Sequence, residues 1–196
     1  MRVVGVGCGP GMLTEAAIDA IAGATLVYGS RRAIDLASAY IAEGAEVHEI
    51  RDYGSLRSLP DHAVVLSTGD PMLAGLGYLG GEVVPGISSL QVAAARIHIP
   101  IRRISVVTAH GRDHEAAMRE TVVEISRGKL VFLVADPDFD VRKMAARLID
   151  AGDAIGIVLA ENLGYPDERI VRGSPADPPV PESGMFCLVL GMLEQL

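Results

Sequence analysis

The segment from Ala63 to Gly75 constrains the fold of this chain more than any other. Its first part, Ala63–Ser67, is an apolar run that predicts a buried strand, and Gly69-Asp70-Pro71 follows it closely. Glycine frees the backbone for a tight turn, and proline sets φ at the start of a helix that we expect over Met72–Tyr78. In open α/β sheets, ligands bind just past the carboxyl ends of strands. The turn therefore predicts either a ligand site or an ordinary strand-to-helix turn with Asp70 as the helix N-cap.

Strands and helices alternate through the first half of the chain. Short runs rich in valine and isoleucine are separated by helical, alanine-rich segments, and glycines or serines stand at the joints. This alternation predicts an α/β protein whose first domain holds a mostly parallel sheet with helices on both faces. The expected strands are Val3–Gly7, Ala24–Tyr28, Glu46–Ile50, Ala63–Ser67 and Glu82–Val84, and the expected helices include Glu15–Ala22, Arg31–Ile41 and Leu90–Ile97.

The pattern changes in the last part of the chain. Two short strands, Arg169–Val171 and Phe186–Leu190, are expected there without a helix between them. Strands that lack a helical crossover pair antiparallel with their neighbours, so a mixed second sheet is expected. We therefore predict two α/β domains, residues 1–108 and 109–196. The other strands of the second half are expected at Ile104–Thr108, Lys129–Ala135 and Ala154–Ala160.

The composition limits the functions that this chain can have. Its formal net charge is −8, from 17 basic and 25 acidic residues. This argues against nonspecific nucleic-acid binding, which needs lysine and arginine to neutralise phosphates. The two cysteines, Cys8 and Cys187, are far apart, so neither a disulfide framework nor a zinc site is indicated, and no metal is expected. No signal peptide and no apolar window of roughly 20 residues are evident, so we expect a cytoplasmic protein without membrane contact.

The glycine-rich start of the chain does not match a nucleotide-binding fingerprint. A dinucleotide site needs the spacing G-x-G-x-x-G, but the third position holds Pro10 when read from Gly5 and Met12 when read from Gly7. A P-loop is also absent from this segment, because no Gly-Lys-Ser/Thr follows. These glycines therefore either let a large ligand approach the backbone or simply shape a turn.

Three glycine-rich segments of the first domain resemble the signatures of the tetrapyrrole (corrin/porphyrin) methylases. They are Gly5–Thr14, Gly69-Asp70-Pro71 and Val84–Ser89. Further segments resemble those of the cobalt-precorrin-7 C(5)-methyltransferases within that family. Several motifs in register along essentially the whole chain are more specific than any one of them. These further segments are Tyr28–Arg32, His110–Asp113, and Ala160–Gly164 with Asp167–Ile170.

The resemblance implies S-adenosyl-L-methionine as cofactor, bound in the cleft between the two domains largely by backbone groups. Asp70 would face the methionine amine or the ribose, and the helix start at Ser88 and Ser89 would receive the methionine carboxylate. An ordinary N-cap at these serines has the same geometry, so that interpretation stays open. Residues at strand ends of the second domain would flank the adenine, with Met185 or Phe186 closing the pocket. The implied cofactor residues are Cys8, Gly69, Asp70, Leu73, Ser88, Ser89, Ala135, Ala160 and Met185.

The resemblance also implies a corrinoid (cobalt-precorrin) substrate with many carboxylate side chains. A protein of net charge −8 would repel this substrate unless arginines gathered at the mouth of the site, where they pair with carboxylates. Arg102 and Arg103 are weaker candidates, and any of these arginines could equally be a solvated surface residue. The implied substrate residues are Gly7, Gly9 and Pro10, as a trough for the macrocycle, together with Arg31, Arg32 and Arg112.

His110 is a weak candidate for a catalytic residue. It lies in a loop after a predicted strand, beside Gly111, where it could orient the ring or move a proton. A lone loop histidine is more often neither. Methyl transfer from a sulfonium needs little beyond exclusion of water and a fixed approach, so no catalytic base is assigned.

The resulting hypothesis is an S-adenosylmethionine-dependent methyltransferase that acts at C(5) of cobalt-precorrin-7 in cobalamin biosynthesis. Alternatives within the class are another tetrapyrrole C-methyltransferase and a diphthine synthase-like methylase. Outside the class, the alternative is a nucleotide- or corrinoid-binding module without turnover. The resemblance further implies a homodimer. In some relatives a C(15)-methyltransferase/decarboxylase is fused to this module, and here we expect it as a separate protein.

Overall fold

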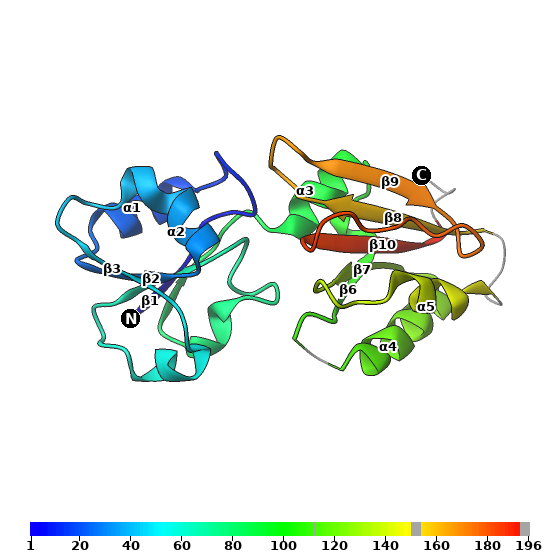
Figure 1. Ribbon diagram of the computed structural model, residues 1–196, viewed down its shortest axis with the longest axis horizontal. Helices are drawn as coiled ribbons and strands as arrows, with labels where there is room; N and C mark the ends of the chain where they lie inside the picture. Colours follow the sequence, from blue (N-terminus) through cyan, green and yellow to red (C-terminus); the bar gives the residue numbers. More distant parts are fainter. Residues whose placement is uncertain (112, 150–153, 193–196) are drawn as a thin grey trace. The chain divides into compact units, whose positions relative to one another are not determined.

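The computed structural model describes residues 1–111, 113–149 and 154–192. The chain forms two compact units, Met1–Ser89 and Leu90–Leu196, each with its own sheet (Figure 1). The two expected α/β domains are therefore present, but they divide earlier than residues 108 and 109. The reason is that the strand Ile104–Thr108, expected in the first domain, pairs with a strand of the second sheet.

The first unit holds a five-stranded sheet in which all neighbouring strands are parallel. Its elements are β1 (Arg2–Gly5), α1 (Glu15–Ala22), β2 (Leu26–Gly29), α2 (Arg31–Ala37), β3 (Glu46–Glu49), β4 (Val64–Ser67) and β5 (Glu82–Val84), with 3-10 helices η1 (Ser38–Tyr40), η2 (Tyr53–Ser58) and η3 (Leu76–Leu79). The strand order is β3-β2-β4-β1-β5.

Local sequence explains where α1 and α2 begin. Thr14 Oγ1 accepts a hydrogen bond from the Ala17 amide at 3.1 Å, and Ser30 Oγ accepts one from the Ala33 amide at 3.3 Å. Each hydroxyl thereby satisfies a backbone donor that the first turn of a helix leaves unpaired. Alanines of both helices pack on strand valines in one buried cluster. Figure 1 shows α1 and α2 together on one side of this sheet.

The prediction of a helix over Met72–Tyr78 is wrong, because the chain forms turns there, followed only by the short η3. Ala74 has a φ of 55°, in the left-handed region, which interrupts any right-handed helix. The Leu76 amide donates instead to the Ser67 hydroxyl at 3.3 Å. This bond ties the segment back to the end of β4.

The second unit holds a mixed five-stranded sheet in the order β6-β7-β10-β8-β9. Its elements are α3 (Ser89–Arg96), η4 (Ile101–Arg103), β6 (Ile104–Thr108), α4 (His114–Ser126), β7 (Leu130–Val134), α5 (Val141–Ala146), β8 (Ile155–Glu161), β9 (Arg169–Gly173) and β10 (Phe186–Met192). β6 and β7 are parallel, whereas β9 and β10 pair antiparallel with their neighbours. The expected antiparallel additions are confirmed. Buried side chains of α4 and α5 pack on one face of the sheet, and Figure 1 shows α3 on the other side.

Within the described ranges, no helix combines the length and the apolar character needed to cross a lipid bilayer. The described side chains also include no group of three or more His, Cys, Asp or Glu that could hold a metal ion.

Candidate active site

The carboxyl ends of β1 and β4 lie side by side in the first sheet, and the chain leaves them in opposite directions. After β1 it passes beyond β4 to reach β2, and after β4 it passes beyond β1 to reach β5. Such a topological switch point is where open α/β sheets bind ligands. The three glycine-rich loops of the sequence follow β1, β4 and β5, so the fold brings all of them to one edge of the sheet.

An isolated antiparallel bridge between Gly7 and Gly69 joins the loops that follow β1 and β4. The Gly69 amide donates to the Gly7 carbonyl at 2.8 Å, and the Gly7 amide donates to the Gly69 carbonyl at 3.3 Å. The φ angles of the two glycines are 78° and 69°, a region that other residues rarely adopt. The two loops therefore form one wall that is lined by backbone.

The Asp70 carboxylate links the loop after β4 to the loop after β5. Oδ1 accepts from the Met72 amide at 2.8 Å and closes the turn, while Oδ2 accepts from the Gly86 amide at 3.0 Å. Because no α-helix follows, Asp70 caps a turn and not a helix. Asp70 thus has a structural role at this edge of the sheet.

The backbone is packed closely where the strands meet these loops, at Gly5, Gly69 and Gly86. A Cβ atom on Gly86 would overlap the Gly69 carbonyl oxygen and lie 2.8 Å from the Gly5 carbonyl carbon. A Cβ atom on Gly5 would lie 2.6 Å from the Gly86 nitrogen. Backbone atoms cannot swing aside as a flexible side chain can, so a side chain here would force the strands or loops apart. This close approach explains why both positions are glycine.

The remaining predicted site residues of the first unit follow the same three strands. Cys8 is half-buried, and its Sγ lies 3.6 Å from Met12 Sδ. Ser88 is only 5% exposed, whereas Leu73 and Ser89 are half-buried. One sheet edge therefore gathers the predicted cofactor residues Cys8, Gly69, Asp70, Leu73, Ser88 and Ser89 and the predicted substrate residues Gly7, Gly9 and Pro10.

Arg31 and Arg32, at the start of α2, have different partners. Arg32 Nη2 donates to Thr68 Oγ1 at 3.0 Å, directly after β4. Arg31 Nε lies 3.2 Å from Asp35 Oδ1, one helical turn along, and its side chain is 76% exposed. Arg32 is thus attached to the edge that carries the glycine-rich loops. The third predicted arginine, Arg112, lies outside the described residues.

The predicted cofactor residues of the second unit also meet at one sheet edge. β10 lies between β7 and β8, and Cys187 is the register partner of both Val134 and Ala160. Because β7 and β8 end where β10 begins, Ala135, Ala160 and Met185 lie on neighbouring strands at that edge. The two alanines are buried, and Met185 is half-buried.

A buried carboxylate, Glu161, holds the loop that carries Met185. Glu161 is 1% exposed, and Oε1 accepts from the Glu182 amide at 2.6 Å and the Ser183 amide at 2.7 Å, while Oε2 pairs with Arg169. Burial raises the pKa of this carboxyl, but the amides and Arg169 outweigh it and hold the pKa below its ordinary value. The sequence pattern did not single out Glu161, since its amide partners lie far along the chain.

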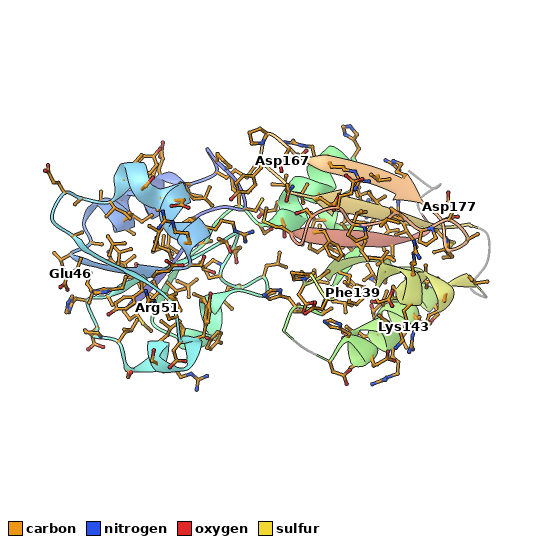
Figure 2. All side chains as sticks on the ribbon, viewed as in Figure 1. Glu46, Arg51, Phe139, Lys143, Asp167 and Asp177 are labelled. Carbon is orange, nitrogen blue, oxygen red and sulfur yellow. The ribbon has the colours of Figure 1, made fainter. Side chains whose placement is uncertain are left out.

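Asn162 extends this connection. Its amide donates to the Met185 carbonyl at 3.0 Å, and its Oδ1 accepts from the Ser183 hydroxyl at 2.7 Å. On the other side, Asn162 Nδ2 donates to Asp167 Oδ2 at 2.8 Å; Asp167 is labelled in Figure 2. The segments Ala160–Gly164 and Asp167–Ile170 are therefore linked to each other and to the start of β10.

His110, the candidate catalytic residue, is exposed, and its ring has no hydrogen-bond partner among the described residues. His114, four positions later, is paired: its Nε2 lies 3.0 Å from Asp136 Oδ2. Burial raises the pKa of Asp136, but the contacts with His114 and the Gly111 amide lower it by more than burial raises it. The pKa of Asp136 therefore lies below its ordinary value. No local pattern joins His114 to Asp136, which is why the sequence pointed to His110.

The sequence matches the model of the Tetrapyrrole (Corrin/Porphyrin) Methylases over residues 2–178. The chain belongs to this family. The resemblance seen in the glycine-rich signatures is thereby confirmed, and as a tetrapyrrole methylase the protein is a methyltransferase. The three loops at the first sheet edge are the structural form of those signatures.

Two relatives have the name that the finer motifs suggested. The chain is 30% identical over 185 residues to the probable cobalt-precorrin-7 C(5)-methyltransferase of Methanocaldococcus jannaschii. The alignment covers 84% of this chain and 85% of that protein. It is 28% identical over 184 residues to the cobalt-precorrin-7 C(5)-methyltransferase of Salmonella typhimurium, with 87% and 88% covered.

Solved structures of other tetrapyrrole methylases share the fold. The precorrin-6Y methylase of Archaeoglobus fulgidus superimposes with a TM-score of 0.75 at 28% identity, over 98% of this chain and 97% of that one. A uroporphyrin-III C-methyl transferase of Thermus thermophilus, crystallised with S-adenyl homocysteine, gives a TM-score of 0.70 at 20% identity over 99% and 98%. The second likeness is one of fold alone.

Proposed function

We propose that this protein transfers a methyl group from S-adenosylmethionine to C(5) of cobalt-precorrin-7 in cobalamin biosynthesis. The observation that carries the proposal is the similarity to two relatives of that activity along more than four-fifths of each chain. The finer motifs support it too, because they extend into both units.

The residues of the first sheet edge suit the polar groups of S-adenosylmethionine. The wall formed by Gly7 and Gly69 is lined by backbone, and the buried Ser88 lies beside it. The Cα atom of Ser88 is 3.9 Å from the position that a Cβ atom on Gly69 would take. A Cβ on Gly11 would meet no atom within 4 Å, so this backbone is open to a ligand. We assign Ser88 and Ser89 to the methionine carboxylate, and Asp70 to the amine or ribose.

The second sheet edge is assigned to the adenine. Ala135 and Ala160 are small and buried, and the adjoining Met185 is half-buried, so they offer an apolar surface to a flat base. S-adenosylmethionine supplies an activated methyl group on a sulfonium centre when it is bound. The protein's own contribution is then to bind, orient and exclude water, which can supply most of the acceleration.

Methyl transfer with an isotopically labelled donor tests the function. Purified protein, cobalt-precorrin-7 and S-adenosylmethionine labelled in its methyl group should yield a product heavier by one methyl, with the label at C(5). Calorimetry should show a preference for S-adenosylmethionine over NAD and ATP. Label at another carbon would indicate a different tetrapyrrole methylase. Absence of labelled product from verified substrate would contradict the enzymatic proposal and favour a binding module.

The homodimer, the cytoplasmic location and a separate C(15)-methyltransferase/decarboxylase partner belong to the same proposal. They rest on the family resemblance and the composition. Sedimentation equilibrium of the purified chain tests the dimer directly, since a monomer has a mass of 20.6 kDa.

Replacing Asp70 with alanine should weaken cofactor binding and lower the free energy of unfolding by about 1–2 kcal/mol, because the Met72 and Gly86 amides both lose their acceptor. Urea unfolding measures the stability, and calorimetry on the folded protein measures the dissociation constant. Asp19→Ala, on the exposed face of α1, is the matched control and should change the stability by less than about 0.5 kcal/mol. Normal cofactor binding by folded Asp70→Ala protein would leave Asp70 only its role as a turn cap.

Arg32 and Arg31 offer a paired test of substrate recognition. We expect Arg32→Ala to raise the KM for cobalt-precorrin-7 about tenfold, since a hydrogen bond to a charged group contributes about 1.5–3 kcal/mol. Arg31→Ala should change KM less than about threefold, because an exposed arginine paired along its own helix contributes little. Steady-state kinetics at saturating S-adenosylmethionine distinguish the two variants. Equal increases in KM for the two variants would contradict the expectation that Arg32, held by Thr68, contributes more to substrate binding than Arg31.

A further inference from the structure

The second unit contains a histidine–aspartate pair that the functional assignment above leaves without a role. His114 is the first residue of α4, and Asp136 follows β7. Their side chains meet at 3.0 Å, and they are 27% and 16% exposed. The pair is thus largely shielded, but each side chain keeps some accessible surface.

The carboxylate of Asp136 is held in place by backbone donors. The Gly111 amide donates to Oδ2 at 3.1 Å, and the Asp138 amide donates to Oδ1 at 3.1 Å. The imidazole of His114 is held in turn by Phe139, whose buried ring meets it edge-on at 5.4 Å between centroids. Phe139 is labelled in Figure 2. Both members of the pair are therefore pre-oriented without a ligand.

The contact also determines the tautomer of His114. An ionised Asp136 can only accept a hydrogen bond, so Nε2 carries the proton in the neutral imidazole. The second ring nitrogen, Nδ1, then has a lone pair. A histidine that a carboxylate orients in this way has the arrangement of a general base.

The pair lies at the sheet edge that carries the predicted adenine contacts. β6 and β7 are parallel neighbours, so the segments that follow them, with His114 and Asp136, leave the sheet at the same edge. Asp136 directly follows Ala135, and the register of β10 brings Ala160 and Met185 to that edge as well.

We propose that His114, oriented by Asp136, accepts the proton that is released when the substrate ring carbon is methylated. This inference rests on the proposed function. A ring carbon that bears hydrogen becomes tetrahedral when it gains a methyl group. Its C–H bond then breaks, the electron pair returns to the conjugated ring, and the proton forms an N–H bond with Nδ1 before it passes to water. Asp136 acts as a positioning residue that stabilises the imidazolium.

Methyl-transfer kinetics of three variants test the role of His114. With cobalt-precorrin-7 and saturating S-adenosylmethionine, His114→Gln should lower kcat about 100-fold or more, because general-base catalysis contributes about 10²–10⁴-fold. The dissociation constant for S-adenosylmethionine, measured by calorimetry, should stay within about twofold. His62→Gln, at an exposed histidine just before β4, is the matched control and should retain kcat within about threefold, and Asp136→Asn should fall between the two. His114→Asn, with the same expectation, replaces the glutamine variant if that variant does not fold.

A spectroscopic measurement tests the orientation independently of turnover. Long-range ¹H–¹⁵N spectra of histidine-labelled protein, recorded without substrate, should show His114 protonated at Nε2 in the wild type and a loss of this tautomer preference in Asp136→Asn. An unchanged tautomer in Asp136→Asn would overturn the role of Asp136.

The kinetic outcomes separate this inference from the function on which it rests. If the wild type transfers methyl and His114→Gln keeps kcat within threefold, only the assignment of His114 is overturned. A large loss of kcat in His110→Gln, measured alongside an active His114→Gln, would overturn the assignment of His114 in favour of His110. A wild type that binds S-adenosylmethionine but transfers no methyl would overturn the proposed function and, with it, this inference.

Discussion

Replacing Gly86 with alanine is expected to destabilise the first unit by about 3 kcal/mol or more and to weaken S-adenosylmethionine binding at least about tenfold. The added Cβ would overlap the Gly69 carbonyl oxygen and lie 2.8 Å from the Gly5 carbonyl carbon. All of these atoms belong to the backbone, so relief requires the loops after β4 and β5 to separate. That movement would also break the bond from the Gly86 amide to Asp70.

Thermal or urea unfolding measures the loss of stability, and calorimetry measures the change in binding. Gly23→Ala is the matched control in the same unit, because its Cβ would lie 3.6 Å from the Asp19 carbonyl oxygen, an ordinary contact, and its φ is −87°. The control should change the stability by less than about 0.5 kcal/mol. If Gly86→Ala binds S-adenosylmethionine as the wild type does, the glycine-rich edge is not part of the cofactor site.

Glu161→Ala is expected to lower the free energy of unfolding by about 3–4 kcal/mol, because it removes a buried carboxylate that serves three donors at once. The Glu182 and Ser183 amides and the Arg169 guanidinium all lose the same carboxylate. Since these contacts fix the loop before β10, the position of Met185 should be disturbed as well. Glu161→Gln keeps an amide oxygen as acceptor and should lose less than half as much stability. Equal losses in both variants would mean that the charge of Glu161, and not its hydrogen bonds, dominates.

The same carboxylate should make stability fall in acid. Its folded-state pKa lies below the ordinary value of about 4.5, so its contribution is present above that value and is lost as the pH falls through the folded pKa. Unfolding by urea between pH 3 and pH 6 should therefore show wild-type stability declining below about pH 4.5. Asp136 and Glu168 have lowered pKa values too and contribute to this decline. In Glu161→Gln the decline should be shallower, and an identical slope in both proteins would contradict this assignment.

Much of the architecture follows from local sequence. The alternation of short apolar strands with alanine-rich helices indicates a parallel first sheet, and the two late strands without a helix between them indicate antiparallel pairing. Thr14 and Ser30 mark the starts of α1 and α2, since an N-cap acts only on the amides of the next turn. The glycine-rich loops could be recognised as a family signature because their chemistry is also local.

Local sequence patterns do not predict the conformation where a distant contact decides it. A helix was expected after Pro71, but the Ser67 hydroxyl holds the Leu76 amide, and Ala74 is left-handed. The sequence places the domain boundary after Thr108, later than the structure does, because nothing near Thr108 reveals that β6 pairs with β7. The sequence favours His110 as the candidate because it lies in a glycine-containing loop, whereas the histidine that pairs with a carboxylate is His114.

Hydrophobic periodicity, helix caps and glycine-rich signatures are enough to predict the fold class, the family and the three glycine-rich loops. The groups that meet at each sheet edge follow from the folded structure alone. The bond from Asp70 to Gly86 joins residues 16 positions apart, and the pairs of Asp136 with His114 and of Glu161 with Ser183 each join residues 22 positions apart. The physical reason is that hydrophobic periodicity, turns and caps act over a few residues, whereas these contacts form only after the strands have assembled into sheets.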